Sequence, residues 1–362
     1  MGSDEEGRTT LRRLLGRLAL ALLSFCLLAL LAAYYFQCDL LSARELVVPS
    51  GVSATNQVEE NAQNHSQHPI RVVILFSKAK DNPGLRDKFS VCVTSLLRHS
   101  SESVVFHIIG DKWSREYADS KVFQALPSAL RSKASLRLHD MDGPASFVTE
   151  KLESVLRFFR YSPTAYYGDN LFFVSMVLYD LPDFESLDRV VMLDSDLKFR
   201  SDIKDLWKLF EDFGPHQLIG IARDMQPVYR HVFSLYRSRN RGTIIGDPPP
   251  DGITGFNSGV LLLDLKKIRH SQLYQELLNP HAIEMLAAKY HFKGTLGDQD
   301  FYSLISTEHM ELFYTLPCSW NRQLCEWWRS HGYKDVFDQY FVCDEPFINV
   351  YHGNCNTPIP ED

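Results

Sequence analysis

The sequence has no excess of basic residues, because its 38 Lys and Arg are outnumbered by 45 Asp and Glu, for a formal net charge of −7 at pH 7. A protein that binds duplex nucleic acid usually presents a strongly basic surface, so this balance argues against that class. The chain also lacks an internal repeat and a low-complexity tract. Its 362 residues predict one large domain with an appendage, or two modest domains, around an ordinary hydrophobic core.

The longest stretch without charge runs from Leu18 to Phe36 and reads LALALLSFCLLALLAAYYF. Its length is close to what a helix needs to cross a bilayer, and Tyr34 and Tyr35 lie where aromatic residues favour the membrane interface. Four arginines precede the run, so the positive-inside rule places the N-terminus in the cytosol and the rest in a lumen. The alternative is a cleaved signal peptide, which the length of the run and the lack of a small-residue cleavage site disfavour.

We therefore predict four segments in a type II, single-pass membrane protein. Residues 1–17 form a cytosolic tail, 18–36 a transmembrane signal anchor, 37–68 a luminal stem and 69–362 the folded domain. The stem is polar and has no hydrophobic period, as is typical of an unfolded linker. It contains the sequon Asn64-His65-Ser66, which is usable for glycosylation only on the luminal side.

Four of the seven cysteines crowd the C-terminal end. In an oxidising lumen they would form two disulfides with three possible pairings. A zinc site is the alternative, which the absence of a C-x-x-C spacing disfavours. The candidate disulfide cysteines are Cys318, Cys325, Cys343 and Cys355.

Segments with strand and helix patterns alternate from Ile70 onward. The strand patterns are IRVVILFSKA from Ile70, Ser103–Asp111, Ala134–His139 and RVVML from Arg189; the helical ones are Asp87–Arg98, Ser114–Leu126 and Asn170–Leu181. Such alternation predicts an α/β fold with a doubly wound parallel sheet. In these sheets ligands bind beyond the carboxyl ends of the strands.

Two aspartates follow the strand pattern RVVML, Asp194 and Asp196, separated by Ser195. Residues i and i+2 of an extended strand point to the same side, so both carboxylates can bind one cation. Hard oxygen ligands suit Mn²⁺ or Mg²⁺. The alternative is an ordinary turn with Asx hydrogen bonds, because a D-x-D triplet by itself is common.

Three further polar motifs flank apolar segments. GFNSG (255–259) leads into the strand pattern VLLLDL, GDQD (297–300) precedes the helical stretch FYSLI, and His352-Gly353 follows the strand pattern near the C-terminus. Glycine lets the backbone approach a ligand, Asn and Ser offer hydrogen bonds, and a neutral imidazole can supply a third metal ligand. Taken singly, each motif also fits a plain loop, a helix cap or a structural histidine.

The order of four motifs in this sequence resembles that in the glycosyltransferases of family 8: D-x-D, N-S-G, G-D-Q-D and a terminal H-G. The resemblance covers about Ile70 to Asp362, and longer blocks narrow it to the xylosyltransferases of that family. The blocks are GIARDMQPVYRH (220–231), GFNSGVLLLDL (255–265), KYHFKGTLGDQDF (289–301), WNRQLCEWWRSHGYKDVF (320–337) and YHGNCNTPIPED (351–362). This resemblance implies a GT-A type α/β fold with a doubly wound mixed sheet in a catalytic domain over 69–362.

The resemblance also implies the roles of individual residues. Metal binding is implied for Asp194, Asp196 and His352. Donor binding is implied for Val73, Ile74, Leu75, Ser195, Asn257, Ser258, Gln299, His352, Gly353 and Asn354. The catalytic candidates are Gln299, Asp298 and Asp300. Residues in blocks without metal chemistry are candidates for acceptor binding, although a core role for the tryptophans is an equal alternative: Met225, Gln226, Tyr229, Trp327 and Trp328.

One departure from the family concerns the leaving group. Many members end in H-x-x-G-x-x-K-P-W, whose lysine faces the diphosphate, whereas this chain reads H-G-N-C-N-T-P. Lys78 and Lys293 are the replacements that the sequence offers.

The implied reaction is a retaining transfer of xylose from UDP-xylose, with Mn²⁺ or Mg²⁺ as cofactor. The implied acceptor is a xylose on the O-glucose glycan of EGF-like repeats of secreted or cell-surface proteins such as Notch, linked α1,3. The implied location is the endoplasmic reticulum membrane, with the Golgi second. Because no nucleophile is unambiguous, we hypothesise front-face substitution, with Gln299 as a dipole near the developing cation.

Two alternatives to this reaction remain open at the level of sequence. One is the same chemistry with UDP-glucose or another acceptor, since a hydroxymethyl group is a small steric difference. The other is an inactive luminal sugar-binding scaffold. The presence of the acidic pair, the histidine and GDQD together favours activity.

Overall fold

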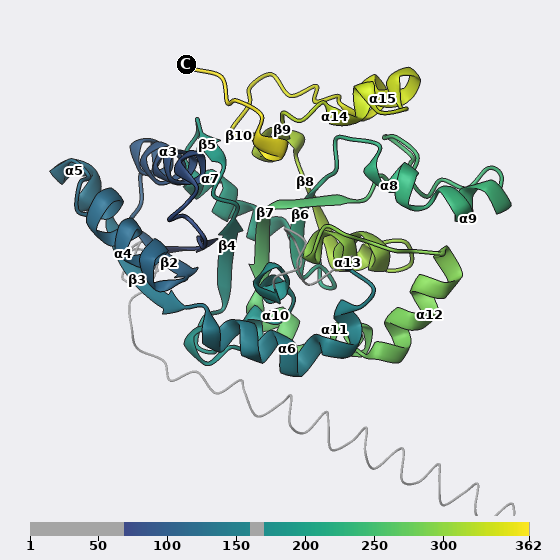
Figure 1. Ribbon diagram of the computed structural model, residues 1–362, viewed down its shortest axis with the longest axis horizontal. Helices are drawn as coiled ribbons and strands as arrows, with labels where there is room; N and C mark the ends of the chain where they lie inside the picture. Colours follow the sequence, from purple (N-terminus) through teal and green to yellow (C-terminus); the bar gives the residue numbers. More distant parts are fainter. Residues whose placement is uncertain (1–68, 160–169, 362) are drawn as a thin grey trace, which may run out of the picture. The chain divides into compact units, whose positions relative to one another are not determined.

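The structure is a computed structural model that describes residues 69–159 and 170–361 (Figure 1). The predicted membrane anchor, the stem and Asn64 lie outside these residues. Among the described residues, no helix has the length and apolarity needed to cross a membrane. The strands are β1 (Ile70–Leu75), β2 (Val104–Gly110), β3 (Ala134–Asp140), β4 (Arg189–Leu193), β5 (Leu197–Phe199), β6 (Ile219–Arg223), β7 (Phe256–Asp264), β8 (Phe313–Leu316), β9 (Arg322–Gln323) and β10 (Val350–His352).

The α-helices range in length from four to 17 residues. The α-helices are α3 (Pro83–His99), α4 (Lys112–Tyr117), α5 (Ser128–Arg131), α6 (Asp142–Leu156), α7 (Ile203–Lys208), α8 (Val228–Val232), α9 (Ser234–Arg239), α10 (Leu265–His270), α11 (Gln272–Leu277), α12 (Pro280–Tyr290), α13 (Asp298–Ile305), α14 (Trp327–Ser330) and α15 (Lys334–Tyr340). Short 3₁₀ turns include η4 (Asn170–Met176), η5 (Leu178–Asp180), η9 (Cys318–Asn321) and η10 (Asn354–Asn356).

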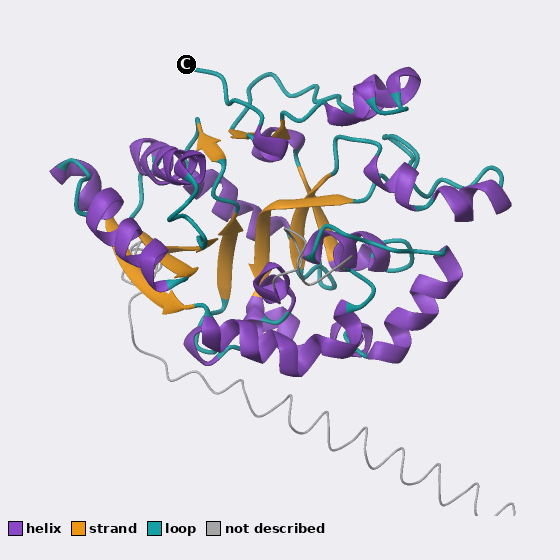
Figure 2. Cartoon of the chain, viewed as in Figure 1, coloured by secondary structure: helices purple, strands orange, loops and turns teal. Residues whose placement is uncertain are grey.

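The main sheet has seven strands in the order β3-β2-β1-β4-β7-β6-β8. Figure 2 shows the strands in orange among the surrounding helices. All of them run parallel except β7, which pairs antiparallel with both β4 and β6. The predicted α/β fold is therefore confirmed, with a mixed sheet instead of the purely parallel one that strand and helix alternation alone predicts.

Both faces of the sheet are buried, which explains the continuous apolar strands. Along β4, Val190 and Met192 enter one core cluster, whereas Val191 and Leu193 enter the other. The first cluster includes residues of α6, α10, α12 and α13, and the second includes residues of α3 and α7. Helices thus cover the sheet on both sides, and polar groups gather at the strand ends.

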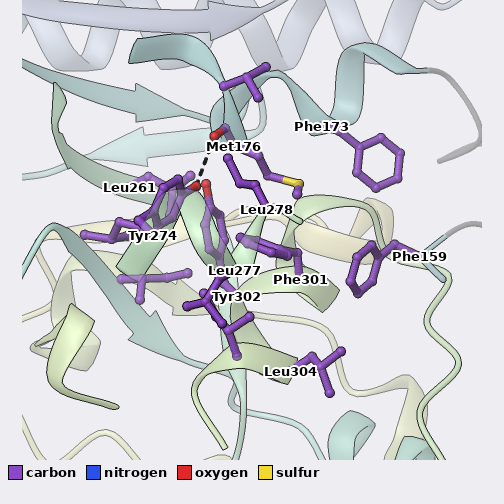
Figure 3. Packing of buried hydrophobic residues seen from close by; sticks show 14 of the residues in the cluster. Phe159, Phe173, Met176, Leu261, Tyr274, Leu277, Leu278, Phe301, Tyr302 and Leu304 are labelled. Carbon is purple, nitrogen blue, oxygen red and sulfur yellow. Dashed lines mark hydrogen bonds between the residues drawn. The ribbon is translucent and has the colours of Figure 1, made fainter. Parts of the chain in front are cut away.

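The helix that carries the GDQD motif is held by the core. All eight residues of α13 are buried, and Phe301 and Tyr302 pack beside Tyr274, whose hydroxyl donates to the Met176 carbonyl at 3.0 Å (Figure 3). Side chains packed on several sides restrict how far a helix can shift. The first turn of α13 is therefore fixed relative to the sheet.

The predicted helix over Asn170–Leu181 is wrong, because the structure has the short turns η4 and η5 there. Leu171, Phe173, Val174 and Met176 are all buried, so the segment has no polar face. A regular amphipathic helix exposes one face to water, and this segment instead follows the irregular space between α6 and α13.

A second, three-stranded sheet joins the C-terminus to the acidic turn. Strand β10 pairs antiparallel with β5 and parallel with β9, so that His352 stands opposite Leu197. Disulfides Cys318–Cys343 and Cys325–Cys355 tie down the surrounding loops and resolve the three pairings that the sequence leaves open. Cys92 is a free, buried cysteine.

The disulfides give a prediction for stability. Replacing Cys325 and Cys355 together by Ala should lower the free energy of unfolding by about 2–5 kcal/mol, because the unfolded chain regains the freedom of a closed loop. Denaturant unfolding measures the change, and the Cys318/Cys343 double Ala variant is a matched control with a similar loop. We expect both variants to lose stability, but only the first to weaken binding of a divalent cation, since Cys355 lies close after His352. Equal cation binding by both would contradict this.

Candidate active site

The antiparallel direction of β7 gathers the polar motifs at one edge of the sheet. The beginning of β7 lies beside the end of β4, where the Asp194 N–H donates to the Gly259 carbonyl at 2.9 Å. The end of β6 also lies there, with Ala222 opposite Asn257. The register between β6 and β7 shifts at this point, which leaves Ser258, Gly259 and Val260 without a partner in β6, although Val260 still pairs with Leu193 of β4. Bulges of this kind often adjoin ligand sites, and the edge matches the position expected for a ligand.

The two aspartates lie in a tight turn between β4 and β5, not along an extended strand, so the predicted geometry is wrong in this detail. Their carboxylates nevertheless converge on His352 from β10. The imidazole Nε2 lies 3.4 Å from Asp194 Oδ2 and 3.3 Å from Asp196 Oδ1. The Gly353 N–H donates to the Asp196 carbonyl at 2.9 Å, which fixes the turn against β10.

The three side chains can hold a divalent cation. One ligand atom from each of Asp194, Asp196 and His352 lies within 4.8 Å of the others. Two carboxylate oxygens and one imidazole nitrogen suit Mn²⁺ and related ions, and three protein ligands leave coordination positions for a substrate. Asp194 is the most exposed of the three and faces solvent, whereas His352 is buried. The donor set fits the predicted metal.

The charges of the cluster depend on one another. Burial alone would lower the pKa of His352, but the carboxylates of Asp196 and Asp194 outweigh it and raise that pKa to about 10. Burial would raise the pKa of Asp196, but His352 and Lys88 lower it to about 2. A metal ligand must be deprotonated at the binding atom, so cation binding has to displace a proton from His352.

Lys88 is the lysine that meets the acidic turn. Its ammonium group from α3 lies 3.5 Å from Asp196 Oδ2, 3.2 Å from the Gly353 carbonyl and 3.3 Å from Asn356 Oδ1. Asp196 thus directs Oδ1 to His352 and Oδ2 to Lys88. Sequence reasoning named Lys78 and Lys293 instead, because no motif marks a lysine in the middle of α3.

The amide of Gln299 is held at both ends. Its Oε1 accepts from Asn257 Nδ2 at 3.1 Å and from the Ser258 N–H at 3.4 Å, and its Nε2 donates to Asp224 Oδ2 at 3.2 Å. All but Ser258 are buried. Burial raises the pKa of Asp224 to about 7, although the hydrogen bond that Asp224 accepts from the Gln226 N–H acts to lower it. These contacts fix both the position and the orientation of the amide.

The two aspartates beside Gln299 point into the protein. Asp298 accepts from the hydroxyls of Ser175 and Ser258, and burial raises its pKa to about 7. Asp300 is fully buried, accepts from the Tyr229 hydroxyl at 3.0 Å and from the Leu296 N–H, and burial raises its pKa to about 6. Neither carboxylate is open to solvent in the way a nucleophile toward a bound sugar would need.

Comparison with known proteins identifies the family. The family described as glycosyl transferase family 8 matches residues 86–338. Xyloside xylosyltransferase 1 of Mus musculus is 43% identical over 330 residues, covering 88% of this chain and 83% of that protein. The Homo sapiens protein of the same name is 45% identical over 330 residues, covering 88% and 82%. This chain belongs to glycosyl transferase family 8.

A solved structure agrees with the family 8 assignment. The crystal structure of mouse xyloside xylosyltransferase 1 in its apo form superposes with a TM-score of 0.76 at 43% identity, covering 81% of this chain and 100% of that one. The GT-A-like α/β fold that the sequence resemblance implies is thus confirmed.

The residues predicted to bind the donor occupy three places. Asn257, Ser258 and Gln299 adjoin one another, and Gly353 lies against Asp196 beside the metal cluster. Asn354 Oδ1 accepts from the Leu324 and Cys325 N–H groups, so this oxygen also supports the loop. Ser195 lies in the acidic turn, partly exposed. In β1, the side chains of Val73 and Ile74 are buried in the two core clusters, and Leu75 is partly buried at the strand end.

The predicted acceptor residues do not form one surface. Tyr229 is fully buried beneath Asp300, so the prediction that it contacts an acceptor is not supported. Met225 and Gln226 are buried beside Asp224, and Gln226 Oε1 is buried with no hydrogen-bond partner among the residues that the structure describes. Trp327 is 50% exposed and stacks on His331, whereas Trp328 is partly buried beside His231 and Tyr333.

Sequence reasoning missed four polar residues that support this site. Asn321 Oδ1 lies 2.9 Å from His352 Nδ1, and its Nδ2 meets Asn257. The others are Lys88, Ser175 and Asp224. Asn321 lies in the block WNRQLCEWWRSHGYKDVF and Asp224 lies in GIARDMQPVYRH, so the likeness of these blocks to family 8 is a signal that could have found both residues.

Gly259 gives a prediction about the metal cluster. A Cβ at Gly259 would lie 2.3 Å from Cε1 and 2.6 Å from Nδ1 of His352, so the ring must move. We expect Gly259→Ala to weaken Mn²⁺ binding by about tenfold or more, by analogy with the loss of a residue that orients a metal ligand. Isothermal titration calorimetry measures the affinity. Gly143→Ala is the control, because nothing lies within 4 Å of a Cβ there, and it should bind Mn²⁺ as the wild type does.

Asp298 gives a prediction about pH. Its pKa is raised from 3.8 to about 7 by folding, so the folded state keeps a proton that the unfolded chain has lost over this range. The free energy of unfolding therefore falls as the pH rises towards about 7. The amide of Asp298→Asn can still form hydrogen bonds with Ser175 and Ser258, but it does not titrate. The free energy of unfolding of this variant should therefore decrease less steeply with pH, by up to about 1.4 kcal/mol per pH unit. Denaturant unfolding in EDTA at several pH values tests it; parallel curves for the two proteins would contradict the assignment.

Proposed function

We propose that this protein transfers xylose from UDP-xylose, with retention of configuration, to a xylose of the xylosyl-glucose glycan on EGF-like repeats, such as those of Notch, in α1,3 linkage. The observation that carries the proposal is the similarity to two proteins named xyloside xylosyltransferase 1 along 88% of the chain. Asp194, Asp196 and Gln299 lie within residues 86–338, the range that matches family 8, and His352 lies after it.

The metal cluster is suited to the departure of UDP. Asp194, Asp196 and His352 would hold Mn²⁺, or Mg²⁺, at the exposed end of the cluster. The bound cation supplies Lewis-acid stabilisation of the negative charge on the leaving diphosphate. Lys88 holds Asp196 in its orientation and adds positive charge beside it. The segment after His352 contains no lysine that could supply this charge. A cation so placed lowers the electrostatic cost of the diphosphate.

The residues near Gln299 favour front-face substitution over a covalent intermediate. Asp298 and Asp300 are buried, and their oxygens accept hydrogen bonds from the protein. The amide of Gln299 is oriented by Asn257 and Asp224 and is a weak nucleophile. Its fixed dipole is better suited to stabilising charge than to forming a bond. Isolation of a xylosyl group bonded to Asp298 or Asp300 would overturn this part of the proposal.

Other features support the proposed acceptor side and location. Trp327 offers an exposed aromatic face of the kind that sugars and proteins contact. The charge pattern around residues 18–36, which lie outside the described residues, supports a type II single-pass topology. The resemblance to the xylosyltransferases of family 8 supports the endoplasmic reticulum membrane, with the Golgi second.

The function is tested by a transfer assay. The purified full-length protein is incubated with Mn²⁺, a xylosyl-glucose EGF repeat and either UDP-xylose or UDP-glucose, and the product is analysed by mass spectrometry and NMR. We expect an α1,3-linked xylose and little transfer from UDP-glucose. EDTA should abolish the transfer, and Asp196→Asn should lower it by about 100-fold or more, since the metal contribution is several kcal/mol. Asp251→Asn, at an exposed aspartate before β7, is the matched control.

The outcomes separate the alternatives. Transfer of glucose in place of xylose would identify UDP-glucose, not UDP-xylose, as the donor. Tight binding of a UDP-sugar without any transfer would favour an inactive sugar-binding scaffold. Unaltered transfer by Asp196→Asn would overturn the assigned metal site. An anomeric configuration opposite to that of UDP-xylose would overturn retention.

A further inference from the structure

We propose that Asn321 is the positioning residue that sets the tautomer of His352 and connects the metal cluster to the amide of Gln299. The inference rests on the proposed metal-dependent transfer and extends it to a residue outside the motifs. Asn321 ends the short turn η9, is fully buried, and lies between His352 and Asn257.

The backbone fixes the orientation of each amide in this chain of hydrogen bonds. The Gly259 N–H lies 3.1 Å from the Asn257 side chain, and a backbone N–H only donates, so the atom that it meets is Oδ1. Asn321 lies 3.3 Å from the Asn257 carbonyl, which only accepts, so the atom of Asn321 there is Nδ2. The Ser258 N–H identifies Oε1 of Gln299 in the same way.

The tautomer of His352 follows from these orientations. Since Nδ2 of Asn321 faces Asn257, its Oδ1 faces His352 Nδ1 at 2.9 Å. A carbonyl oxygen only accepts, so Nδ1 carries the proton in the neutral imidazole. The lone pair is then on Nε2, the atom that faces Asp194 and Asp196. Metal-binding histidines commonly have their second nitrogen held in this way.

The same hydrogen bonds run onward to the sugar side of the site. Asn257 Oδ1 accepts from Asn321 Nδ2 at 2.9 Å, which leaves Asn257 Nδ2 to donate to Gln299 Oε1. Gln299 Nε2 then donates to Asp224. If one side-chain amide were turned over, its oxygen would face another acceptor oxygen at the next contact, and no hydrogen bond could form there. Asn321 therefore acts on two groups at once, with its oxygen on the metal ligand and its nitrogen on the amide network.

Two substitutions separate these two actions. Asn321→Leu is similar in size but forms neither bond, so we expect Mn²⁺ affinity and the transfer rate each to fall by about 10–100-fold. Asn321→Asp keeps an oxygen for His352 Nδ1, but its ionised carboxylate cannot donate to Asn257. We expect this variant to bind Mn²⁺ within about threefold of the wild type while its kcat falls by about 10–100-fold.

The measurements are Mn²⁺ affinity by electron paramagnetic resonance of the free ion, kcat and KM for xylose transfer, and thermal stability, all on the full-length protein. Asn349→Leu is the matched control. Its side chain forms hydrogen bonds with Ser319 and Ser201 instead of with the metal ligands, so the substitution should leave Mn²⁺ affinity and kcat unchanged. A purely structural role for Asn321 would lower both quantities together in the Leu and the Asp variants.

The proposal is overturned if Asn321→Asp transfers xylose at the wild-type rate, or if its Mn²⁺ affinity falls in parallel with kcat. A folded Asn321→Leu protein with wild-type Mn²⁺ affinity also overturns it. If Asn321→Leu does not fold, the Asp variant alone decides. Failure of the proposed function is seen separately, in the wild type. A wild-type protein that binds Mn²⁺ but transfers no xylose would overturn the proposed xylose transfer. The comparison of Mn²⁺ affinities among the variants would still test the role of Asn321.

Discussion

The antiparallel pairing of β7 between β4 and β6 is the constraint on which the site depends. It brings the start of one strand beside the ends of two others, so GFNSG meets the acidic turn and Asp224 at a single edge. In a purely parallel sheet the start of β7 would lie at the opposite edge, far from Asp194. The register shift between β6 and β7 then leaves Ser258 and Gly259 without a partner in β6 and open to the site.

The buried polar groups around this edge form one connected network rather than a set of separate contacts. Five buried side chains follow one another through hydrogen bonds: His352, Asn321, Asn257, Gln299 and Asp224. A buried polar group without a partner is costly, so a substitution at one member affects the next. The network is therefore rigid and directional, which is what a site needs in order to present charges to a substrate without reorganisation.

Positive charge at the metal turn comes from α3 instead of the C-terminus. Lys88 contacts Asp196, the Gly353 carbonyl and Asn356, and so joins a helix near the start of the domain to the last strand. The Cys325–Cys355 disulfide holds the same C-terminal segment from the other side. The segment after His352 is thus held by a disulfide at Cys355 and by hydrogen bonds from Lys88 to Gly353 and Asn356, although it contains no lysine.

The sequence by itself determined the α/β class, the family and the residue types of the metal cluster, because apolar strands and short polar motifs at their ends are local patterns. It also narrowed the disulfides to four cysteines. Only the tertiary structure decided that β7 is antiparallel, that the segment over Asn170–Leu181 is irregular, and which cysteines pair. It also placed Lys88 and Asn321 in the site and Tyr229 out of reach of solvent. These are contacts between residues far apart in the chain, and no local pattern encodes which distant partner a buried side chain meets.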